Sequence, residues 1–458
     1  MNVNNELWQK ILDFDFDSSG GNYPFTVRLA SENAWPEYFT QQALLEYRKF
    51  MYLAATAGSM VSPSEIVDVV WHQHLIFTQS YKAFCALLGK DIQHIPSTHH
   101  KAEATIFKDS ATRTAELYVA AFGPQPKEIW NERSMLSGLN LKQSGIQPDT
   151  FLMFAVPAVL LLLGPAYFLL KPLYVHISNP TFPILATALG IIVIVLLKEY
   201  NKNYLKRFLN SFNSKSVLFN LKPFEMVYLK HGNINAVANG SLGELMYEEL
   251  IRFDQEHCFS TIEDRPVKEK YMRIGMETIT EHGRIAHKEL LNILVCKPLF
   301  NNIKKSMDAL GRHIQSTDKI VRLFCLNFVV LAIVALLIYT RLVTGLMLGK
   351  PVLIIAVIAI AYTVGAFTHL KALAAEPLRK TLPTYYLKEK LSDFEINSDW
   401  QWVYLLKGPA LLNVAFLTAA YPNYKENNWE PGSSCSSCTS SSSCGSSCGS
   451  SCGGCGGD

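Results

Sequence analysis

The sequence predicts a mainly α-helical membrane protein with four transmembrane helices, helical soluble segments and a disordered tail. Two observations predict this fold class. Hydrophobic residues make up 49% of the 458 residues, more than a soluble multidomain protein needs. The excess lies in four runs nearly free of charge, each close to the roughly 20 residues with which a helix crosses a bilayer. These runs are residues 151–170, 182–197, 323–340 and 352–370.

Residues 1–149 are predicted to form a soluble helical domain. Residues 41–55 repeat apolar side chains at helical spacing. The stretch Ser-Pro-Ser-Glu at 62–65 supplies an N-cap, a proline at the first helical position and a glutamate in the first turn, so a second helix is expected to begin here. Thr78 is expected to cap a third helix, which Gly89 would end.

The four runs are expected to form two transmembrane hairpins, at residues 150–197 and 321–370. Pro157 and Pro165 lie within the first run. A membrane helix tolerates such prolines because neighbouring helices can satisfy the freed carbonyls, so a kinked first helix is expected. The second run is short, which leaves open a re-entrant or interfacial arrangement of the first hairpin.

Residues 198–320 and 371–430 are predicted to be helical segments on the cytoplasmic side. Residues 242–257 and 287–314 carry apolar side chains at the spacing of amphipathic helices. We expect these helices to pack against each other near the membrane surface.

Two weaker patterns concern other parts of the soluble segments. Residues 23–29 alternate between apolar and polar side chains and are expected to hold a strand or an extended arm. The triplet Val-Tyr-Leu occurs at 227–229 with Gly232 after it, and again at 403–405 with Gly408 at the same offset. Each is expected to end a helix at a left-handed glycine, before a new apolar helix begins.

The placement of basic residues predicts the orientation in the membrane. The segments that follow the second and fourth runs are rich in lysine, whereas the loops inside the hairpins hold only Lys171, Arg341 and Lys350. Positive charge marks the cytoplasmic side. We therefore expect a multi-pass protein of the cytoplasmic membrane with both termini in the cytoplasm, in keeping with an N-terminus that lacks the features of a secretory signal.

The sequence also bears on the classes of partner. The formal net charge is +3, and no basic stripe interleaved with aromatic residues is present. Nucleic acid is therefore not an expected partner, whereas the lipid bilayer is. His369, near the end of the fourth run, is the only clear ionisable residue inside the spans, and it is expected to snorkel toward the interface. A transporter or proton relay is therefore disfavoured.

Two histidines, His72 and His74, lie on the second predicted helix of the N-terminal domain. If the helix continues through both, their side chains lie about 200° apart around its axis and cannot bind one ion. If it ends near Trp71, both imidazoles reach one side, and His94, or His99 and His100, could complete a site. Three imidazoles with a carboxylate behind one of them would suit zinc or another borderline divalent metal.

The carboxylate that could support such a site is Asp68, one helical turn before His72. The alternative is a structural one, in which the histidines and Trp71 join two helices by packing and hydrogen bonding. Cys85 lies in an apolar helix, where a thiol is usually inert. No nucleophile elbow, phosphate-binding loop, dinucleotide fingerprint or zinc-protease motif is present, so no catalytic or cofactor-binding residue is predicted.

Residues 431–458 form a Ser/Gly/Cys-rich tail that holds six of the 10 cysteines. With no apolar residue to bury, it is expected to be disordered. Two Cys-x2-Cys pairs have the spacing of a four-cysteine zinc site. In the cytoplasm the thiols would stay reduced and could bind zinc or copper(I); covalent use of the thiols, or an extension without a ligand, are the alternatives. The paired residues are Cys435, Cys438, Cys452 and Cys455.

A combined pattern over residues 35–130 resembles the glycine-rich domain-containing protein-like family of bacteria and plants. Asp68, Trp71, Thr78 and Tyr81 are its structural motif residues, and His72, His74, Cys85, Gly89, His94 and Pro96 complete it. The resemblance implies a domain type and no reaction. The chain from about residue 150 resembles a bacterial family of membrane proteins with a Gly/Cys-rich end, so the protein would be a fusion of the two.

These expectations favour a bacterial integral membrane protein that acts as an interaction, scaffolding or sensing component, with an unknown protein partner. Two alternatives stay open. One is a metal-dependent enzyme that uses His72, His74 and His94. The other is a metal or redox sensor that uses the cysteine tail.

Overall fold

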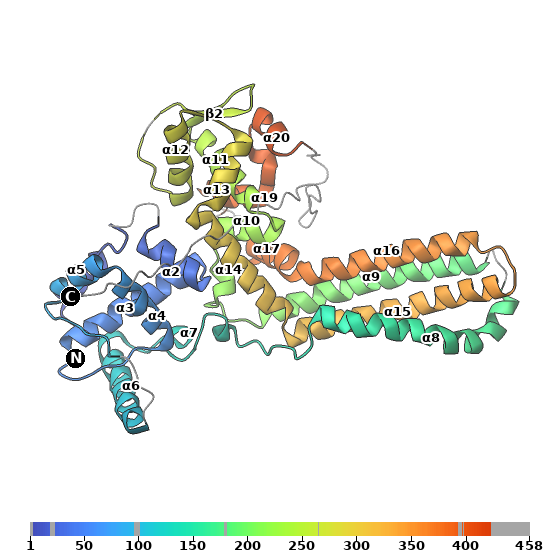
Figure 1. The fold of residues 1–458 in the computed structure, drawn as a ribbon, viewed down its shortest axis with the longest axis horizontal. Coiled ribbons are helices and arrows are strands. Elements are labelled where there is room, and N and C mark those ends of the chain that lie inside the picture. Colours follow the sequence, from blue (N-terminus) through green and yellow to red (C-terminus); the bar gives the residue numbers. More distant parts are fainter. Residues whose placement is uncertain are drawn as a thin grey trace, which may run out of the picture.

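The computed structural model describes residues 3–18, 23–95, 101–177, 181–263, 265–392, 396 and 398–422. Within these ranges the chain is mainly helical, as predicted. Figure 1 shows a long helical bundle at one end and groups of shorter helices at the other. The four paired tail cysteines lie outside the described residues, as do Pro96, His99 and His100.

Four helices of the bundle are long and apolar enough to cross a membrane, in agreement with the four predicted runs. They are α8 (Pro148–His176), α9 (Thr181–Asn210), α15 (Asp318–Met347) and α16 (Leu353–Glu376). The short second run is part of a 30-residue helix, because the helix continues into the charged segment that follows it. A bent pair, Trp400–Leu411 with Val414–Ala420, would add a fifth span only if its two parts, 81° apart, formed one unit.

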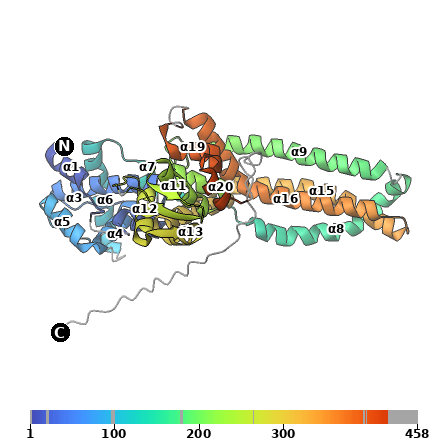
Figure 2. The ribbon, with the colours of Figure 1, turned by 90° about the horizontal axis from the view of Figure 1, so that it is seen from above.

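Within the bundle, α15 packs against the other three helices, and α16 also packs against α9 (Figure 2). The outermost helix, α8, is continuous through Pro157, Pro165 and Pro172. Most of its apolar side chains face outward, as expected for a helix whose surroundings are lipid.

The N-terminal group of helices, termed here the N-lobe, consists of residues 3–139 as far as they are described. An extended segment at 23–29 is not observed, because the second helix begins at Phe25. Phe25 and Leu29, four residues apart, are both fully buried, so their helical spacing prevails over the local alternation. The helices are α1 (Asn5–Asp13), α2 (Phe25–Asn33), α3 (Glu37–Thr56), α4 (Glu65–Ile76), α5 (Thr78–Leu88), α6 (Lys101–Phe122) and α7 (Lys127–Trp130).

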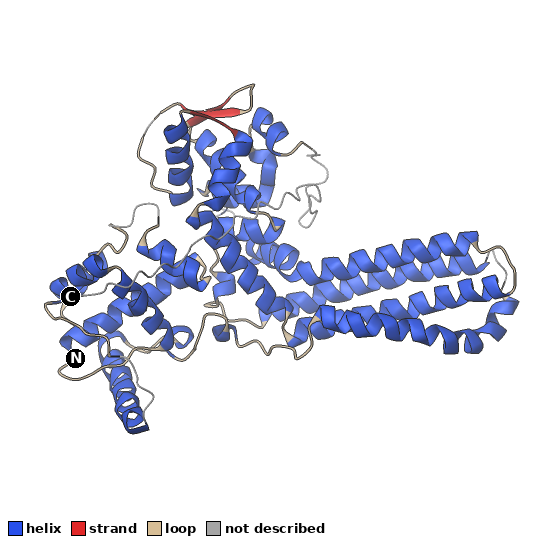
Figure 3. Cartoon of the chain, viewed as in Figure 1, coloured by secondary structure: helices blue, strands red, loops and turns tan. Residues whose placement is uncertain are grey.

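The second group of helices, the middle lobe, comes from residues 217–315. It contains a three-stranded antiparallel sheet at its far edge, drawn in red in Figure 3. The predicted helix over 242–257 is wrong beyond Tyr247, because Glu249 adopts a positive φ of 57° and the chain turns into a strand. The elements are α10 (Pro223–His231), α11 (Ile234–Tyr247), β1 (Ile251–Phe253), β2 (Cys258–Thr261), α12 (Lys270–His282), β3 (Arg284–Ala286), α13 (His287–Cys296) and α14 (Pro298–Gln315).

The segment after the fourth span packs on the middle lobe. It contains α17 (Leu382–Tyr385), between two π-helical turns, followed by α19 (Trp400–Lys407) and α20 (Val414–Ala420). The repeated Val-Tyr-Leu pattern lies on α10 and α19, which contact each other. Both helices end at a glycine with positive φ, 65° at Gly232 and 63° at Gly408. The predicted left-handed cap is confirmed at Gly232, whose ψ is 22°, and is wrong at Gly408, whose ψ is −146°.

The N-lobe packs against the middle lobe through α2, which lies on α14. At the edge of this contact, the Glu37 backbone N–H donates to the Glu225 carboxylate at 2.8 Å, and Lys270 pairs with the Glu37 side chain. Glu225 is only 2% exposed, and its burial raises the pKa of this carboxyl to about 7. Only Ser316 and Thr317 separate α14 from the membrane helix α15.

Candidate metal centre

The helix that carries the two histidines begins at Glu65, two residues later than the predicted start. Ser64 is its N-cap and accepts a hydrogen bond from the Val67 backbone N–H at 3.2 Å. The helix continues to Ile76, so the alternative in which it ends near Trp71 is wrong. The two histidines therefore lie on different sides of α4.

His74 is part of the N-lobe core. Its side chain is fully buried and takes part in two hydrogen bonds, one between Nδ1 and the Tyr47 hydroxyl at 2.8 Å and one between Nε2 and the Ser80 hydroxyl at 3.0 Å. Burial lowers the pKa of His74 to about 3, so the ring is neutral at physiological pH. Both ring nitrogens are occupied, and His74 does not join the set in which it was predicted.

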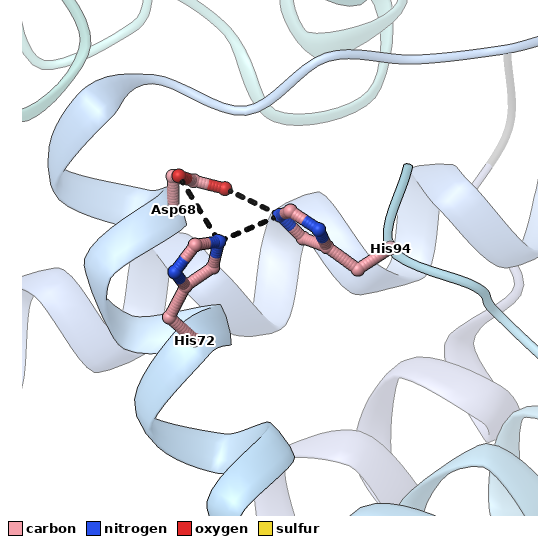
Figure 4. Close-up of side chains that lie close together, drawn as sticks. All are labelled: Asp68, His72 and His94. Carbon is pink, nitrogen blue, oxygen red and sulfur yellow. Dashed lines mark hydrogen bonds and ion pairs between the residues drawn. The ribbon is translucent and has the colours of Figure 1, made fainter. Parts of the chain in front are cut away.

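His72 and His94 converge with Asp68 on the other side of α4 (Figure 4). Nε2 of His94 lies 3.0 Å from Asp68 Oδ1 and 2.9 Å from Nε2 of His72. Nε2 of His72 lies 3.5 Å from Asp68 Oδ2. Asp68 and His72 are one turn apart on α4, whereas His94 comes from the segment after α5.

The separations among these atoms match the requirements of a metal ion. Ligands at 2.0–2.1 Å in a tetrahedral arrangement lie about 3.3 Å apart. The two Nε2 atoms are 2.9 Å apart, and each lies 3.0 or 3.5 Å from its nearer carboxylate oxygen of Asp68, Oδ1 for His94 and Oδ2 for His72. A hydrogen-bonded triad satisfies the same atoms less well, because no assignment of the Nε2 protons gives each of the three contacts both a donor and an acceptor. Two imidazoles and one carboxylate form a donor set that suits zinc, and that also occurs in non-haem iron sites.

The cluster is accessible from one side. The side chain of His72 is 57% exposed and that of Asp68 is 38% exposed, while His94 is 17% exposed. Three protein ligands that face solvent leave at least one coordination position for water or another ligand. The sequence indicated Asp68 as a support for a histidine; in the structure its carboxylate lies beside both imidazoles and is a third candidate ligand.

A second buried polar cluster in the N-lobe has a structural explanation. Glu46 accepts hydrogen bonds from the Tyr118 hydroxyl and the Trp130 indole, both at 2.7 Å, and pairs with Lys49 at 2.8 Å. Because both carboxylate oxygens have partners within the chain, this cluster joins α3, α6 and α7 and offers no ligand position.

Residues 32–116 match the family model described as UCP032817-like. The match spans α3, α4 and α5, and therefore includes Asp68, His72 and His94. The predicted relationship to the glycine-rich domain-containing protein-like family is wrong, because this segment matches a different family. No match supports the predicted fusion with a bacterial membrane-protein family. No curated protein and no solved structure matches the chain.

Proposed function

We propose that this protein is a membrane-anchored sensing component that binds a divalent metal ion, zinc foremost, at Asp68, His72 and His94. The observation that carries the proposal is the convergence of three ligand atoms from two segments within 4.8 Å of one another. An imidazole pair held by one carboxylate at these separations has the composition of a metal site. The metal would join α4 to the segment that follows α5.

The arrangement of the lobes supports a cytoplasmic metal site. The described soluble parts gather at one end of the bundle, and the C-terminal ends of α8 and α15 lie at the other (Figure 1). The lysine-rich segments that follow α9 and α16 lie at the same end of the bundle as the lobes. Positive-inside bias favours this end on the cytoplasmic side. We therefore propose a multi-pass protein with both termini in the cytoplasm.

A sensing role is favoured by the chain of contacts that leads from the site to the membrane. Gln73, next to His72, is placed so that its amide can donate to Glu32 at 2.8 Å and accept from Arg28 at 3.3 Å on α2. Helix α2 packs on α14, which leads into α15. A change at α4 on metal binding would therefore reach the spans through packed helices.

A second candidate function is metal-dependent hydrolysis, which the exposure of His72 favours. A catalytic zinc site uses three protein ligands and keeps a fourth position for water, whose pKa the metal lowers. The sensing proposal requires that the protein binds a metal and does not require catalysis. The alternative requires that the protein hydrolyses a substrate and that this activity disappears when the metal is removed.

The experiment that tests the site is metal analysis of the full-length protein in detergent after zinc loading and desalting. We expect about one ion per chain to be lost in each of Asp68→Ala, His72→Ala and His94→Ala. His282→Ala is the matched control, because His282 is an exposed histidine on α12, far along the chain from the cluster. Zinc content unchanged in all three site variants would overturn the proposal.

The same measurement separates the site from the tail. A variant with serine at the four paired cysteines is expected to keep the ion bound by the histidines. If metal disappears only in this variant, the cysteine tail is the metal-binding element, and the histidine cluster is a hydrogen-bonded triad.

A further inference from the structure

The segment that supplies His94 has no regular secondary structure. After α5 ends at Gly89, whose φ is 68°, residues 91–95 run back along α4 without helix or strand. A ligand on such a segment needs external support, because a free loop would lose much conformational entropy on binding a metal. Ile92, which is 8% exposed, is one anchor for this segment.

The second anchor is a hydroxyl group. Tyr81 on α5 donates a hydrogen bond to the backbone carbonyl of Ile92, two residues before His94. The same hydroxyl accepts a hydrogen bond from the Trp71 indole N–H at 3.1 Å. Burial raises the pKa of Tyr81, so its hydroxyl stays protonated and can donate at physiological pH.

The tryptophan ring completes the support. Trp71 lies between Asp68 and His72 on α4, and its ring meets the His94 ring edge-on at a centroid distance of 4.6 Å. Trp71 therefore contacts His94 directly. It also orients the Tyr81 hydroxyl, which holds the segment that carries His94.

From this geometry we infer that Tyr81, oriented by Trp71, is the positioning residue that sets the metal affinity of the centre by fixing His94 toward Asp68 and His72. The inference rests on the proposed metal site and deepens it. Tyr81 does not contact the metal; it acts through the Ile92 carbonyl. Outer-shell partners of metal ligands typically contribute about 10- to 100-fold in affinity.

The test is zinc affinity of full-length protein, measured by competition with a chromophoric chelator. Tyr81→Phe keeps the ring and removes the hydroxyl, and we expect its dissociation constant for zinc to rise by about 10-fold or more. Tyr52→Phe is the matched control, because Tyr52 is a buried N-lobe tyrosine whose hydroxyl accepts from the Asn4 backbone N–H. Its zinc affinity should stay within about twofold of wild type.

A double-mutant cycle separates positioning from general destabilisation. If Tyr81 acts through His94, then Tyr81→Phe should have no further effect on the residual zinc affinity of His94→Ala. An equal effect in both backgrounds would overturn the inference. The absorption of bound cobalt gives a second readout, since loss of the His94 ligand changes the coordination geometry in Tyr81→Phe but not in Tyr52→Phe.

Trp71→Phe provides a second variant should Tyr81→Phe fold poorly. It keeps an aromatic ring beside His94 and removes the indole N–H, so a smaller loss of zinc affinity is expected than for Tyr81→Phe. Wild-type protein without zinc binding would overturn both the proposed function and this inference. Wild-type binding with unchanged affinity in Tyr81→Phe and Trp71→Phe would overturn this inference alone.

Discussion

Two imidazoles two residues apart on α4 have opposite environments, and this difference decides what each can do. His74 is enclosed by the rings of Phe16, Phe25 and Phe84, with centroid distances of 4.9, 5.4 and 5.7 Å. The side chain of His72 is 57% exposed, so a ligand can reach it from solvent. Burial makes the first a structural residue, and exposure leaves the second available to a metal.

The first prediction concerns His74→Ala. Removing a buried ring leaves a cavity and two unpaired hydroxyl groups, so the free energy of unfolding should fall by about 2–4 kcal/mol while bound zinc is retained. His72→Ala, at an exposed position, should change it by less than about 0.5 kcal/mol. Thermal unfolding followed by circular dichroism, together with metal analysis, gives both results. A His74→Ala protein of normal stability that lacks zinc would contradict this assignment.

A second prediction at the residue scale concerns pH. Burial, and secondarily the nearby His257, lower the pKa of His287 to about 4 from its ordinary 6.5. The unfolded chain then binds a proton that the folded chain excludes, so stability is lost as the pH falls from 6.5 toward 4. At pH 5 this loss amounts to about 2 kcal/mol relative to pH 8. His287→Gln, which can still donate to Asn239, should unfold with a correspondingly smaller pH dependence between pH 8 and 5.

Comparing wild type with His287→Gln separates the contribution of His287 from that of the other titrating groups. The readout is the difference in melting temperature between wild type and His287→Gln at each pH. Parallel curves over this range would show that His287 does not exclude its proton in the folded state.

Part of the metal centre could be predicted from the sequence. Asp68 and His72 are four residues apart on a helix with a clear start signal, so their proximity follows from helical geometry. His94 could be named as a candidate but not placed, because its position depends on the hydrogen bond between Tyr81 and the Ile92 carbonyl. A bond from a side chain to a backbone carbonyl in a loop leaves no periodic signal in the sequence.

At the scale of elements, the contact between α11 and α19 depends on the absence of a side chain. A Cβ atom on Gly240 would lie 2.6 Å from the Tyr404 ring and 3.1 Å from the Phe224 ring. Tyr404 in turn donates a hydrogen bond to the Ala236 carbonyl at 3.0 Å. The close approach of α11 to Tyr404 of α19 at this position therefore requires a glycine.

The third prediction follows from this contact. Gly240→Ala should lower the free energy of unfolding by about 1–3 kcal/mol, because two buried aromatic rings must shift to admit the methyl group. Gly164→Ala is the matched control, since its added Cβ meets no atom within 4 Å and alanine is the better helix former. Thermal unfolding should show a lower midpoint for the first variant and an equal or higher one for the second. Equal effects at the two sites would refute the packing argument.

Elements whose apolar residues repeat at one clear helical spacing could be predicted from the sequence. Elements whose conformation depends on contacts with distant parts of the chain could not. The pattern over 287–314 indicated helix, and the structure has α13 and α14 there. The chain after Tyr247 continues a helical pattern yet forms β1, because Phe253 packs with Phe259 from β2 and Phe416 from α20. Those partners come from distant parts of the chain, which local periodicity does not represent.

At the scale of the whole molecule, a polar cluster joins three of the four spans. Asn201 on α9 and Asn327 on α15 exchange two hydrogen bonds, at 2.9 and 2.8 Å, and His369 on α16 bonds Asn327 at 2.9 Å. His369 is 8% exposed, so the expectation that it snorkels to the interface is wrong. Polar side chains buried between membrane helices are costly unless they are hydrogen-bonded to one another. The hydrogen bonds among these three residues therefore fix the register of α9, α15 and α16.

The last prediction concerns orientation, and it follows from the placement of the lobes relative to the bundle. Each hairpin enters and leaves the bundle at the end where the lobes pack, so both turns must emerge on the same opposite face. The segments that leave the second and fourth spans on the side of the lobes are rich in lysine, whereas the hairpin loops hold only Lys171, Arg341 and Lys350, and this bias favours the lobes on the cytoplasmic side. A reporter enzyme active only outside the cytoplasm should therefore be active when fused at residue 177 or 349, and inactive when fused at residue 215.

The three fusions test the fold as well as the orientation. Activity at both turns, with none at 215, requires all four helices to cross the bilayer. An inactive fusion at 177 with an active one at 349 would mean that the first hairpin does not span the membrane, the re-entrant arrangement that the short second run left open. Activity at 215 alone would place Asp68, His72 and His94 outside the cell, where a metal would reach them without crossing the membrane.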